Sequence, residues 1–314
     1  MKIAVVGAGA MGCLFGGLLA DAGNEVYLVD VWQEHVEVIN QTGLTINGVS
    51  GDKRITSIRA TTNPITVGTC DLVIVFVKAT VTRTAIQQAL PLMTKDTVIL
   101  TLQNGLGNVE AISEEVGREK IIAGVTAHGS TLVSPGVIRH AGQGVTVIGE
   151  VTGTRSQRIQ ALKTTFESAG IETEIEDNVM GLIWGKLMAN IGINALTAIT
   201  GLKNGQLMAY AETSELLEAA VKEAMLVAEE KGIKLKEPDP VAYVRSICRK
   251  TAENRSSMLQ DISRGSRTEI DVINGAIMKE GSMLGIDTPV NRVLTLLVRA
   301  LEKKMIDSNN QSHG

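Results

Sequence analysis

The chain has 314 residues and a formal net charge of −4, and its composition is 44% hydrophobic, 20% charged and only 3% aromatic. This balance is that of a folded protein of one large or two ordinary domains, and it excludes a chain that is mostly disordered. A sequence pI near 5.7 and the scarcity of aromatic rings argue against a basic or base-stacking surface, so we expect no nucleic acid partner.

Cysteine and histidine usage bears on compartment and metal binding. Cys13, Cys70 and Cys248 are widely spaced and odd in number. This usage predicts a reducing compartment, the cytoplasm, without a disulfide framework. The chain has no CxxC pair, and its four histidines do not sit at metal-ligand spacing, so we expect no bound metal.

The N-terminal segment is predicted to form a strand, a helix and a second strand, at 2–6, 10–22 and 25–29. The stretch Ile3–Ala20 carries no charge, so it also resembles a signal peptide or a membrane span. Its many glycines are untypical of such segments, whose apolar region is rich in leucine. We therefore expect no membrane association.

Two later apolar runs, at 71–77 and 97–102, are hydrophobic on both faces, as buried parallel strands are. A helix over 79–90 can form the crossover between them. Residues 121–149 are rich in Gly, Val and Thr and predict further strands. Strands that alternate with helices in this way predict an α/β fold with a parallel sheet.

The pattern becomes helical in the second half of the chain. After a helix ending near 169 and a short strand at 171–175, no strand is expected beyond 178. The polar tail from Ser308 is expected to fray. The expected helices span 179–201, 213–232, 240–262, 268–284 and 288–304. We therefore predict an α/β domain at 1–175 and an all-α domain at 176–314.

The segment Gly7-Ala8-Gly9-Ala10-Met11-Gly12 matches the GxGxxG fingerprint of dinucleotide-binding Rossmann folds. The first glycine permits a tight turn, the second lets the backbone approach a pyrophosphate, and the third lets helix and strand pack closely. The motif follows a predicted strand and opens a predicted helix, which is the context that the fingerprint requires. The alternative is a glycine-rich turn without a ligand.

Asp30 stands at the end of the second predicted strand, 18 residues after Gly12. A carboxylate there accepts hydrogen bonds from an adenosine ribose diol and repels a 2′-phosphate. The following residues Val31, Trp32 and Gln33 include no arginine that would bind that phosphate. The residues thus favour NAD(H), while the alternative is that Asp30 only turns the chain toward solvent.

Lys186, Asn190 and Asn194 follow one another at spacing i, i+4 and i+8. On a helix these side chains line one face, among apolar neighbours. Such polar groups suit a cleft that holds a carbonyl and hydroxyl groups, since a core would need to satisfy them. A partly exposed helix edge remains an equal alternative.

A second polar cluster spans Thr251–Ser257 and Thr268–Asn274. Thr268 is a fair helix N-cap, which would place Glu269 in the first turn, where the helix dipole favours a carboxylate. The alternative is a role in capping and at the surface only.

Together these motifs resemble the ketopantoate reductase (2-dehydropantoate 2-reductase) family, from residue 1 to about 300. The motifs are Gly7–Gly12, Gln103-Asn104-Gly105, Lys186 with Asn190 and Asn194, Lys203-Asn204-Gly205, Glu253-Asn254 with Ser257, and Thr268-Glu269-Ile270-Asp271. The resemblance implies an N-terminal Rossmann domain, a helical C-terminal domain, and reduction of 2-dehydropantoate to (R)-pantoate with a nicotinamide cofactor, in pantothenate biosynthesis.

The resemblance also implies roles for individual residues. Lys186 matches the catalytic lysine, and Glu269 matches the acid that positions cofactor or substrate. The cofactor-binding positions are Gly7, Ala8, Gly9, Ala10, Met11, Gly12, Asp30, Lys78, Asn104, Ser130 and Glu269. The substrate-binding positions are Asn104, Lys186, Asn190, Asn194, Asn204, Asn254 and Ser257.

The chain departs from the family pattern at two points. Well-studied members prefer NADP(H) and carry an arginine just after the second strand, where this chain has Asp30 and Val31. NAD(H) is thus favoured and NADP(H) stays open. Gly185 also replaces a bulkier polar residue of many members. A homodimer stays open as well.

Two other functions are weighed against this one. A related NAD-dependent D-2-hydroxyacid dehydrogenase would act on other branched 2-oxo acids. A cofactor-binding redox sensor would need no catalytic groups, and Lys186 and Glu269 argue against it.

Overall fold

The computed structural model describes residues 1–311, which form two compact units. The first unit comprises Met1–Gln103 and Asn108–Val179, and the second comprises Asn104–Gly107 and the chain from Met180 onward. The change from the first to the second unit near Val179 coincides with the start of a long helix.

The first unit is built on an eight-stranded sheet in the order β12-β11-β8-β7-β6-β1-β2-β5. Neighbouring strands are parallel except for β11, which runs antiparallel to β8. The strand bounds are β1 (Lys2–Val6), β2 (Glu25–Val29), β5 (Arg59–Thr61), β6 (Leu72–Val75), β7 (Val98–Thr101), β8 (Ile121–Thr126), β11 (Thr146–Glu150) and β12 (Thr173–Ile175). The chain reverses its direction of winding between β1 and β6, where ligands of doubly wound sheets bind beyond the carboxyl ends of the strands.

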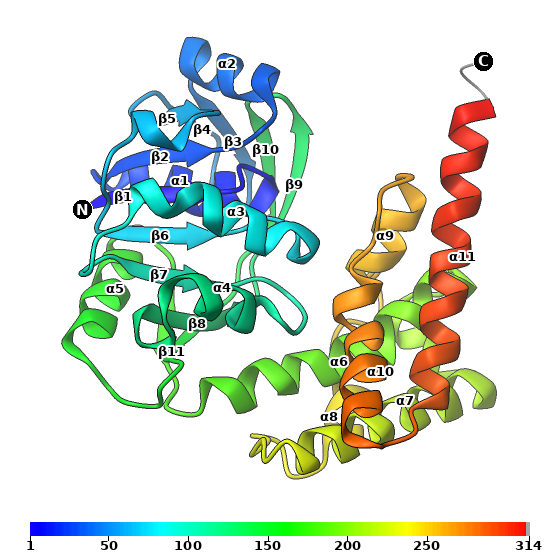
Figure 1. Ribbon diagram of the computed structural model, residues 1–314. Helices are drawn as coiled ribbons and strands as arrows, with labels where there is room; N and C mark the ends of the chain where they lie inside the picture. Colours follow the sequence, from blue (N-terminus) through cyan, green and yellow to red (C-terminus); the bar gives the residue numbers. More distant parts are fainter. Residues whose placement is uncertain (312–314) are drawn as a thin grey trace. The chain divides into compact units, whose positions relative to one another are not determined.

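Helices cover both faces of this sheet. Figure 1 shows α3 and α4 in front of β6, β7 and β8, with α1 behind the sheet. The helix bounds are α1 (Ala10–Asp21), α2 (Gln33–Thr42), α3 (Thr82–Ala89), α4 (Asn108–Val116) and α5 (Gln157–Ser168). The fully buried apolar residues of β1 and β6 form the centre of the core. The predicted α/β fold is confirmed.

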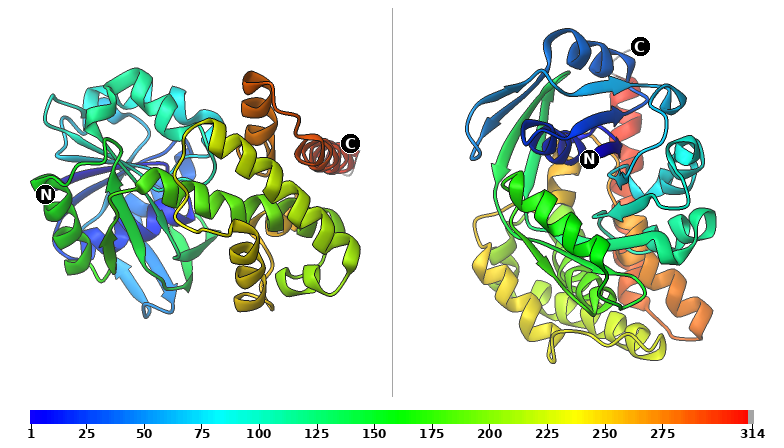
Figure 2. Two further views of the ribbon diagram at one scale, coloured as in Figure 1. Left: turned by 90° about the horizontal axis from the view of Figure 1, so that it is seen from below. Right: turned by 90° about the vertical axis from the view of Figure 1, so that its left-hand side faces the viewer.

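A second sheet packs against α1, in the order β4-β3-β10-β9. Its strands are β3 (Leu44–Gly48), β4 (Lys53–Ile55), β9 (Gly129–Ser134) and β10 (Val137–Gly142). Figure 2 shows the blue β3–β4 hairpin beside the green β9 and β10. A Cβ on Gly17 would lie 2.6 Å from Ile46 Cδ1, so this glycine lets α1 lie close to β3. The sequence patterns predicted neither α2 nor the β3–β4 hairpin.

The described residues of the second unit form helices joined by turns and loops, without a strand. Its helices are α6 (Val179–Thr200), α7 (Ala211–Glu230), α8 (Pro240–Lys250), α9 (Ser257–Ser263), α10 (Asn274–Leu284) and α11 (Pro289–Gln311). α7, α10 and α11 pack against one another (Figure 1). α6 is long and apolar enough by composition to cross a membrane, but 67% of its most apolar window is buried inside the protein, as in the core helix of a water-soluble domain.

Two predicted helices are broken in the structure. The helix expected at 240–262 ends at Lys250, and α9 begins after Ser256, whose Oγ accepts a hydrogen bond from Leu259 N at 3.1 Å. A serine that caps a new helix start competes with helix continuation.

The polar tail is more regular than expected, since α11 continues to Gln311, while 312–314 lie outside the described residues.

The prediction that Thr268 caps a helix is wrong. The segment 268–284 contains only a 3₁₀ turn, Ile270–Val272, before α10 starts at Asn274. Thr268 Oγ1 accepts a hydrogen bond from Ile270 N at 3.2 Å, which closes a local side-chain turn instead of a helix cap. Glu269 therefore does not lie in the first turn of an α-helix.

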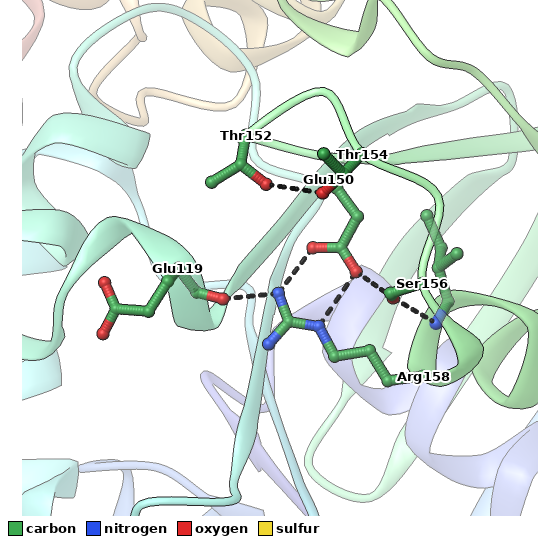
Figure 3. Close-up of polar contacts among 7 residues, drawn as sticks. Glu119, Glu150, Thr152, Thr154, Ser156 and Arg158 are labelled. Atoms are coloured by element: carbon green, nitrogen blue, oxygen red, sulfur yellow. Dashed lines mark hydrogen bonds and ion pairs between the residues drawn. The ribbon is translucent and has the colours of Figure 1, made fainter.

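A buried ion pair connects β11 to α5 in the first unit. Arg158 binds both carboxylate oxygens of Glu150 and also donates to Glu119 O, and Ser156 Oγ donates to Glu150 (Figure 3). The Glu150 side chain is 3% exposed and that of Arg158 is 32% exposed. The bidentate pair fixes the loop that leads into α5.

Candidate functional site

The glycine loop after β1 has the geometry that a dinucleotide needs. Gly7 has φ +99°, and a Cβ there would lie 2.7 Å from Val77 N. A Cβ on Gly12 would lie 1.9 Å from Gly7 O, whereas one on Gly9 would meet no atom within 4 Å. Gly7 and Gly12 thus serve close packing, and Gly9 leaves an open approach to the backbone.

The N-terminus of α1 can hold an anion. The helix begins at Ala10, and no side chain among residues 1–311 caps it by a hydrogen bond. Its first N–H groups and the helix dipole attract a phosphate. The residues present therefore fit the pyrophosphate of a nicotinamide dinucleotide.

Asp30 lies beside this loop and is fixed by two backbone donors. Ala8 N donates to Asp30 Oδ2 at 2.6 Å, and Trp32 N donates to Asp30 Oδ1 at 3.0 Å. Each carboxylate oxygen has more than one acceptor site, so both keep capacity for a diol. The alternative that Asp30 only turns the chain does not account for its bond to the glycine loop.

Two further loops converge on the carboxyl ends of β1 and β6. Exposed Lys78 follows β6, directly after the Val77 that packs against Gly7. Gln103, after β7, donates to Val77 O at 2.7 Å and to Thr82 Oγ1 at 2.8 Å. Ser130 lies on β9 of the second sheet, where its Oγ donates to Arg139 O at 3.3 Å.

The second unit gathers a lysine, a carboxylate and an amide. Lys186 on α6 is half-buried and interacts with the charge of Glu269. Asn104 Nδ2 donates to Glu269 Oε2 at 3.3 Å. Asn104 reaches this unit because Leu106 N bonds to Val272 O at 2.9 Å.

Burial alters the acidity of the lysine. Desolvation disfavours the ammonium and lowers the pKa of Lys186 to about 8, while the nearby Glu269 carboxylate opposes this effect. A lysine with such a pKa carries a proton near neutral pH and can release it to a substrate. General acids with a pKa near the working pH are efficient.

α6 places its polar residues on one face, as the spacing predicted. Asn190 is half-buried, and Asn194 is 5% exposed. A Cβ on Gly192 would lie 2.9 to 3.1 Å from side chains of α7 and α8, so α6 packs through this glycine. A larger residue at position 192 would collide with side chains of α7 and α8, because these helices approach α6 closely.

Asn204 is held in one orientation by Thr251. Thr251 Oγ1 lies 2.8 Å from Ile247 O and uses its single proton there. It must therefore accept from Asn204 Nδ2, 2.9 Å away. Asn204 Oδ1 is buried and has no hydrogen-bond partner among residues 1–311. A buried carbonyl oxygen of this kind calls for a donor, and a substrate hydroxyl would supply one.

The neighbouring turn presents two exposed polar residues. Asn254 and Ser257 are exposed, whereas Ser256 is 6% exposed and bonds to Thr197 Oγ1 at 2.6 Å. Asn254 O accepts a hydrogen bond from Asn204 N at 3.0 Å, so the backbone of this turn is fixed to the segment that carries Asn204. Ser256 is thus structural, and Ser257 remains open to a ligand.

Sequence patterns did not single out Trp32, His35 and Cys13 as site residues, yet they contact the glycine loop or one another. Thr251 belongs to a polar cluster that the sequence showed, but its role in orienting Asn204 depends on a tertiary contact. Gln103 belongs to a motif that the sequence showed, but its role in joining two loops depends on tertiary contacts. Among residues 1–311, no group of three or more His, Cys, Asp and Glu residues could hold a metal ion.

Comparisons with known proteins agree on one family. A family model described as "Ketopantoate reductase PanE/ApbA" matches residues 3–153, and its "C terminal" counterpart matches 178–302. A 2-dehydropantoate 2-reductase of Pyrococcus horikoshii is 40% identical over 302 residues, which are 96% of this chain and 98% of that protein. The one of Halobacterium salinarum is 36% identical over 303 residues, 96% of this chain and 99% of that protein.

Solved structures give the same result. A PanE/ApbA family ketopantoate reductase from Ralstonia eutropha matches with a TM-score of 0.88 and 38% identity, covering 97% of this chain and 99% of that chain. A D-mandelate dehydrogenase with NADH and anilino(oxo)acetate matches with a TM-score of 0.90 and 32% identity, with the same coverage. The chain belongs to the ketopantoate reductase family.

Proposed function

We propose that this protein reduces 2-dehydropantoate to (R)-pantoate with a nicotinamide cofactor, and that NADH is the preferred cofactor. The main observation behind this proposal is the environment of Lys186. Its pKa is lowered by burial and it lies near the charge of Glu269, which suits a proton donor. The family membership supports the reaction. The substrate is a small 2-oxo acid, and the step belongs to pantothenate biosynthesis.

Lys186 would act as the general acid. The cofactor supplies a hydride when bound, and its addition to a ketone builds negative charge on the carbonyl oxygen. An ammonium held against this oxygen stabilises the charge and donates the proton. General acid catalysis of this kind contributes about 10²–10⁴-fold in rate.

Glu269 and Asn104 would hold the lysine and the ligand in place. The Glu269 carboxylate favours the ammonium form of Lys186, and Asn104 bonds to the same carboxylate. Binding positions for the substrate are proposed at Asn104, Lys186, Asn190, Asn194, Asn204, Asn254 and Ser257. Apart from Lys186, these neutral amides and hydroxyls bond a carboxylate and a hydroxyl without adding charge.

The cofactor would bind to the first unit. The glycine loop 7–12 and the start of α1 would hold the pyrophosphate, Asp30 the ribose diol, and Lys78 and Ser130 other parts of the cofactor. The carboxylate of Asp30 supports NADH because a 2′-phosphate would meet its negative charge. The absence of an arginine at 31–33 has the same effect.

A steady-state assay tests both parts of the proposal. We expect kcat/KM for 2-dehydropantoate to exceed that for 2-oxoisovalerate, and NADH to outperform NADPH. Comparable kcat/KM for the two 2-oxo acids would refute the proposed substrate. A strong preference for NADPH would refute the role given to Asp30 but leave the reaction intact.

A D-2-hydroxyacid dehydrogenase acting on other 2-oxo acids is the second candidate. It is favoured by the likeness to D-mandelate dehydrogenase, which was solved with NADH. Adding an aryl 2-oxo acid to the same assay separates the two candidates. We further propose a cytoplasmic location, which the three buried free thiols support, and light scattering would decide whether a homodimer forms.

A further inference from the structure

The peptide of Ala8, at the centre of the glycine loop, is held from both sides. Its N–H donates to Asp30 Oδ2 at 2.6 Å. Its carbonyl oxygen lies 3.0 Å from Cys13 Sγ, which donates to it. The backbone of the loop is therefore coupled both to the carboxylate proposed for the ribose and to the first turns of α1.

The proton positions around Cys13 follow from His35. Gly136 N donates to His35 Nδ1 at 3.0 Å, so this nitrogen carries no proton. The neutral imidazole then carries its proton on Nε2, 3.3 Å from Cys13 Sγ. Because Nε2 donates to the sulfur, the thiol proton remains for Ala8 O. Burial lowers the pKa of His35 in spite of the opposing effects of the Asp30 carboxylate and the Ala8 backbone, and burial raises the pKa of Cys13. Both directions favour the neutral forms.

Trp32 connects His35 to Asp30. Its indole stacks on His35 with centroids 5.1 Å apart and an interplanar angle of 11°. Its backbone N–H donates to Asp30 Oδ1 at 3.0 Å. Asp30, Ala8, Cys13, His35 and Trp32 thus form a closed ring of contacts, which we call the Asp30 ring.

We propose that Cys13 and His35 are positioning residues for the adenosine half of the cofactor, acting through the Ala8 peptide and Trp32. The proposal rests on the proposed function, in which the glycine loop and Asp30 hold NADH. Without the Cys13 thiol the Ala8 carbonyl loses a buried hydrogen bond, and the peptide gains freedom to rotate. Without His35 the indole of Trp32 loses its stacking partner, and the segment that carries Asp30 loosens.

Isothermal titration of the full chain with NADH and with ADP-ribose tests this role without turnover. We expect Cys13→Ala and His35→Phe to weaken both ligands by about tenfold, the size of one lost buried hydrogen bond. Cys13→Ser keeps a donor for Ala8 O and an acceptor for His35, so it should restore most of the affinity. Steady-state assays should show a raised KM for NADH, with kcat and the KM for the 2-oxo acid little changed.

Cys70→Ala is the matched control. Cys70 is also a buried free thiol of the first unit, but it precedes β6 at the amino end of the strands, away from the glycine loop. Its removal should leave both dissociation constants within about twofold, since it breaks no contact of the Asp30 ring.

The results separate the two proposals. A wild-type chain that binds neither NADH nor ADP-ribose would refute the proposed binding of NADH at Asp30, on which the positioning role rests. A wild-type chain that binds both, together with Cys13→Ala and His35→Phe variants of unchanged affinity, would refute only the positioning role. An equal loss in Cys13→Ala and Cys70→Ala would also overturn it, because the effect would then reflect general destabilisation.

Discussion

At the scale of single residues, the proposed role of Lys186 as proton donor depends on its surroundings. An ammonium on a largely apolar helix is poorly solvated, and its proton becomes easier to release. Glu269 limits this effect, and Asn104 bonds to Glu269 in turn. The pKa of Lys186 is therefore set by two opposing effects, since burial lowers it and the Glu269 carboxylate raises it.

Replacing Lys186 tests its proposed role as the proton donor. We expect Lys186→Ala to lower kcat for reduction of 2-dehydropantoate by at least about 100-fold, because general acid catalysis supplies a factor of this size. Titration with NADH should give a nearly unchanged dissociation constant. A kcat within a few-fold of the wild type would show that another group donates the proton.

The pH profile reports on the same lysine. In the proposed mechanism the reduction needs the ammonium form of Lys186, so kcat/KM should fall as pH rises through about 8, the pKa of Lys186. Glu269 raises this pKa, and Glu269→Gln should therefore move the fall in rate to lower pH. Identical profiles for wild type and variant would contradict the coupling.

Thr251 determines which end of the Asn204 amide is left for a ligand. Thr251→Val keeps the shape but removes the acceptor for Asn204 Nδ2. If Asn204 binds substrate as proposed, the KM for 2-dehydropantoate should rise about fivefold to tenfold, while NADH affinity stays constant. Thr251→Ser keeps the hydroxyl and serves as the control. A Thr251→Val variant with wild-type KM would remove Asn204 from the substrate site.

At the scale of elements, short polar contacts decide where helices begin. Ser256 caps α9, so the region predicted as one helix at 240–262 is divided. Thr268 closes a turn, and the helix predicted from 268 starts only at Asn274. These breaks place Asn254, Ser257 and Glu269 in or beside turns, where side chains project from irregular backbone. Residues of binding sites often occupy such positions.

The connection between β11 and α5 depends on Arg158. We expect Arg158→Met to lower the free energy of unfolding by about 2 kcal/mol, less than a fully buried pair because the arginine is one-third exposed. Arg155→Met is the control, since the Arg155–Asp177 pair has side chains 63% and 57% exposed and should matter little. Urea unfolding followed by circular dichroism compares them, and equal stabilities would contradict the importance of the buried pair.

At the scale of the whole molecule, the two units have different architectures and separate hydrophobic cores. The first combines a doubly wound sheet with a small second sheet, and it holds three buried histidines. His128 Nδ1 lies 3.0 Å from His140 Nε2, and His35 joins α2 to the turn before β10. Burial lowers the pKa of all three.

This burial makes stability depend on pH. Below the ordinary histidine pKa of about 6.5 the unfolded chain binds protons that the native histidines resist, so stability falls as pH falls through this range. Above about pH 7 the histidines are neutral in both states and contribute no slope. Urea unfolding at pH values from 8 to 5.5 measures the effect. A stability that stays constant from pH 7 to 5.5 would contradict it.

Much of the fold was predictable because its patterns are local. β1, α1, β2 and the buried strands β6 and β7 carry strong apolar runs, and the long helix α6 has a continuous apolar composition. The hairpin β3–β4 is short and weakly patterned, and it forms because Leu44 and Ile46 pack on α1. Its existence depends on a surface that the local sequence does not contain.

The sequence by itself determined the glycine loop, the carboxylate at the end of β2 and the polar face of α6, since fixed spacings along one strand or helix encode them. Only the tertiary structure decided that Asn104 reaches Glu269, that Thr251 orients Asn204 and that Cys13 and His35 brace the loop at Ala8. These contacts join residues far apart in the chain, and the acidity of Lys186 depends on the burial that such contacts create. Hydrogen-bond direction and desolvation are properties of packed neighbours, so no local pattern can specify them.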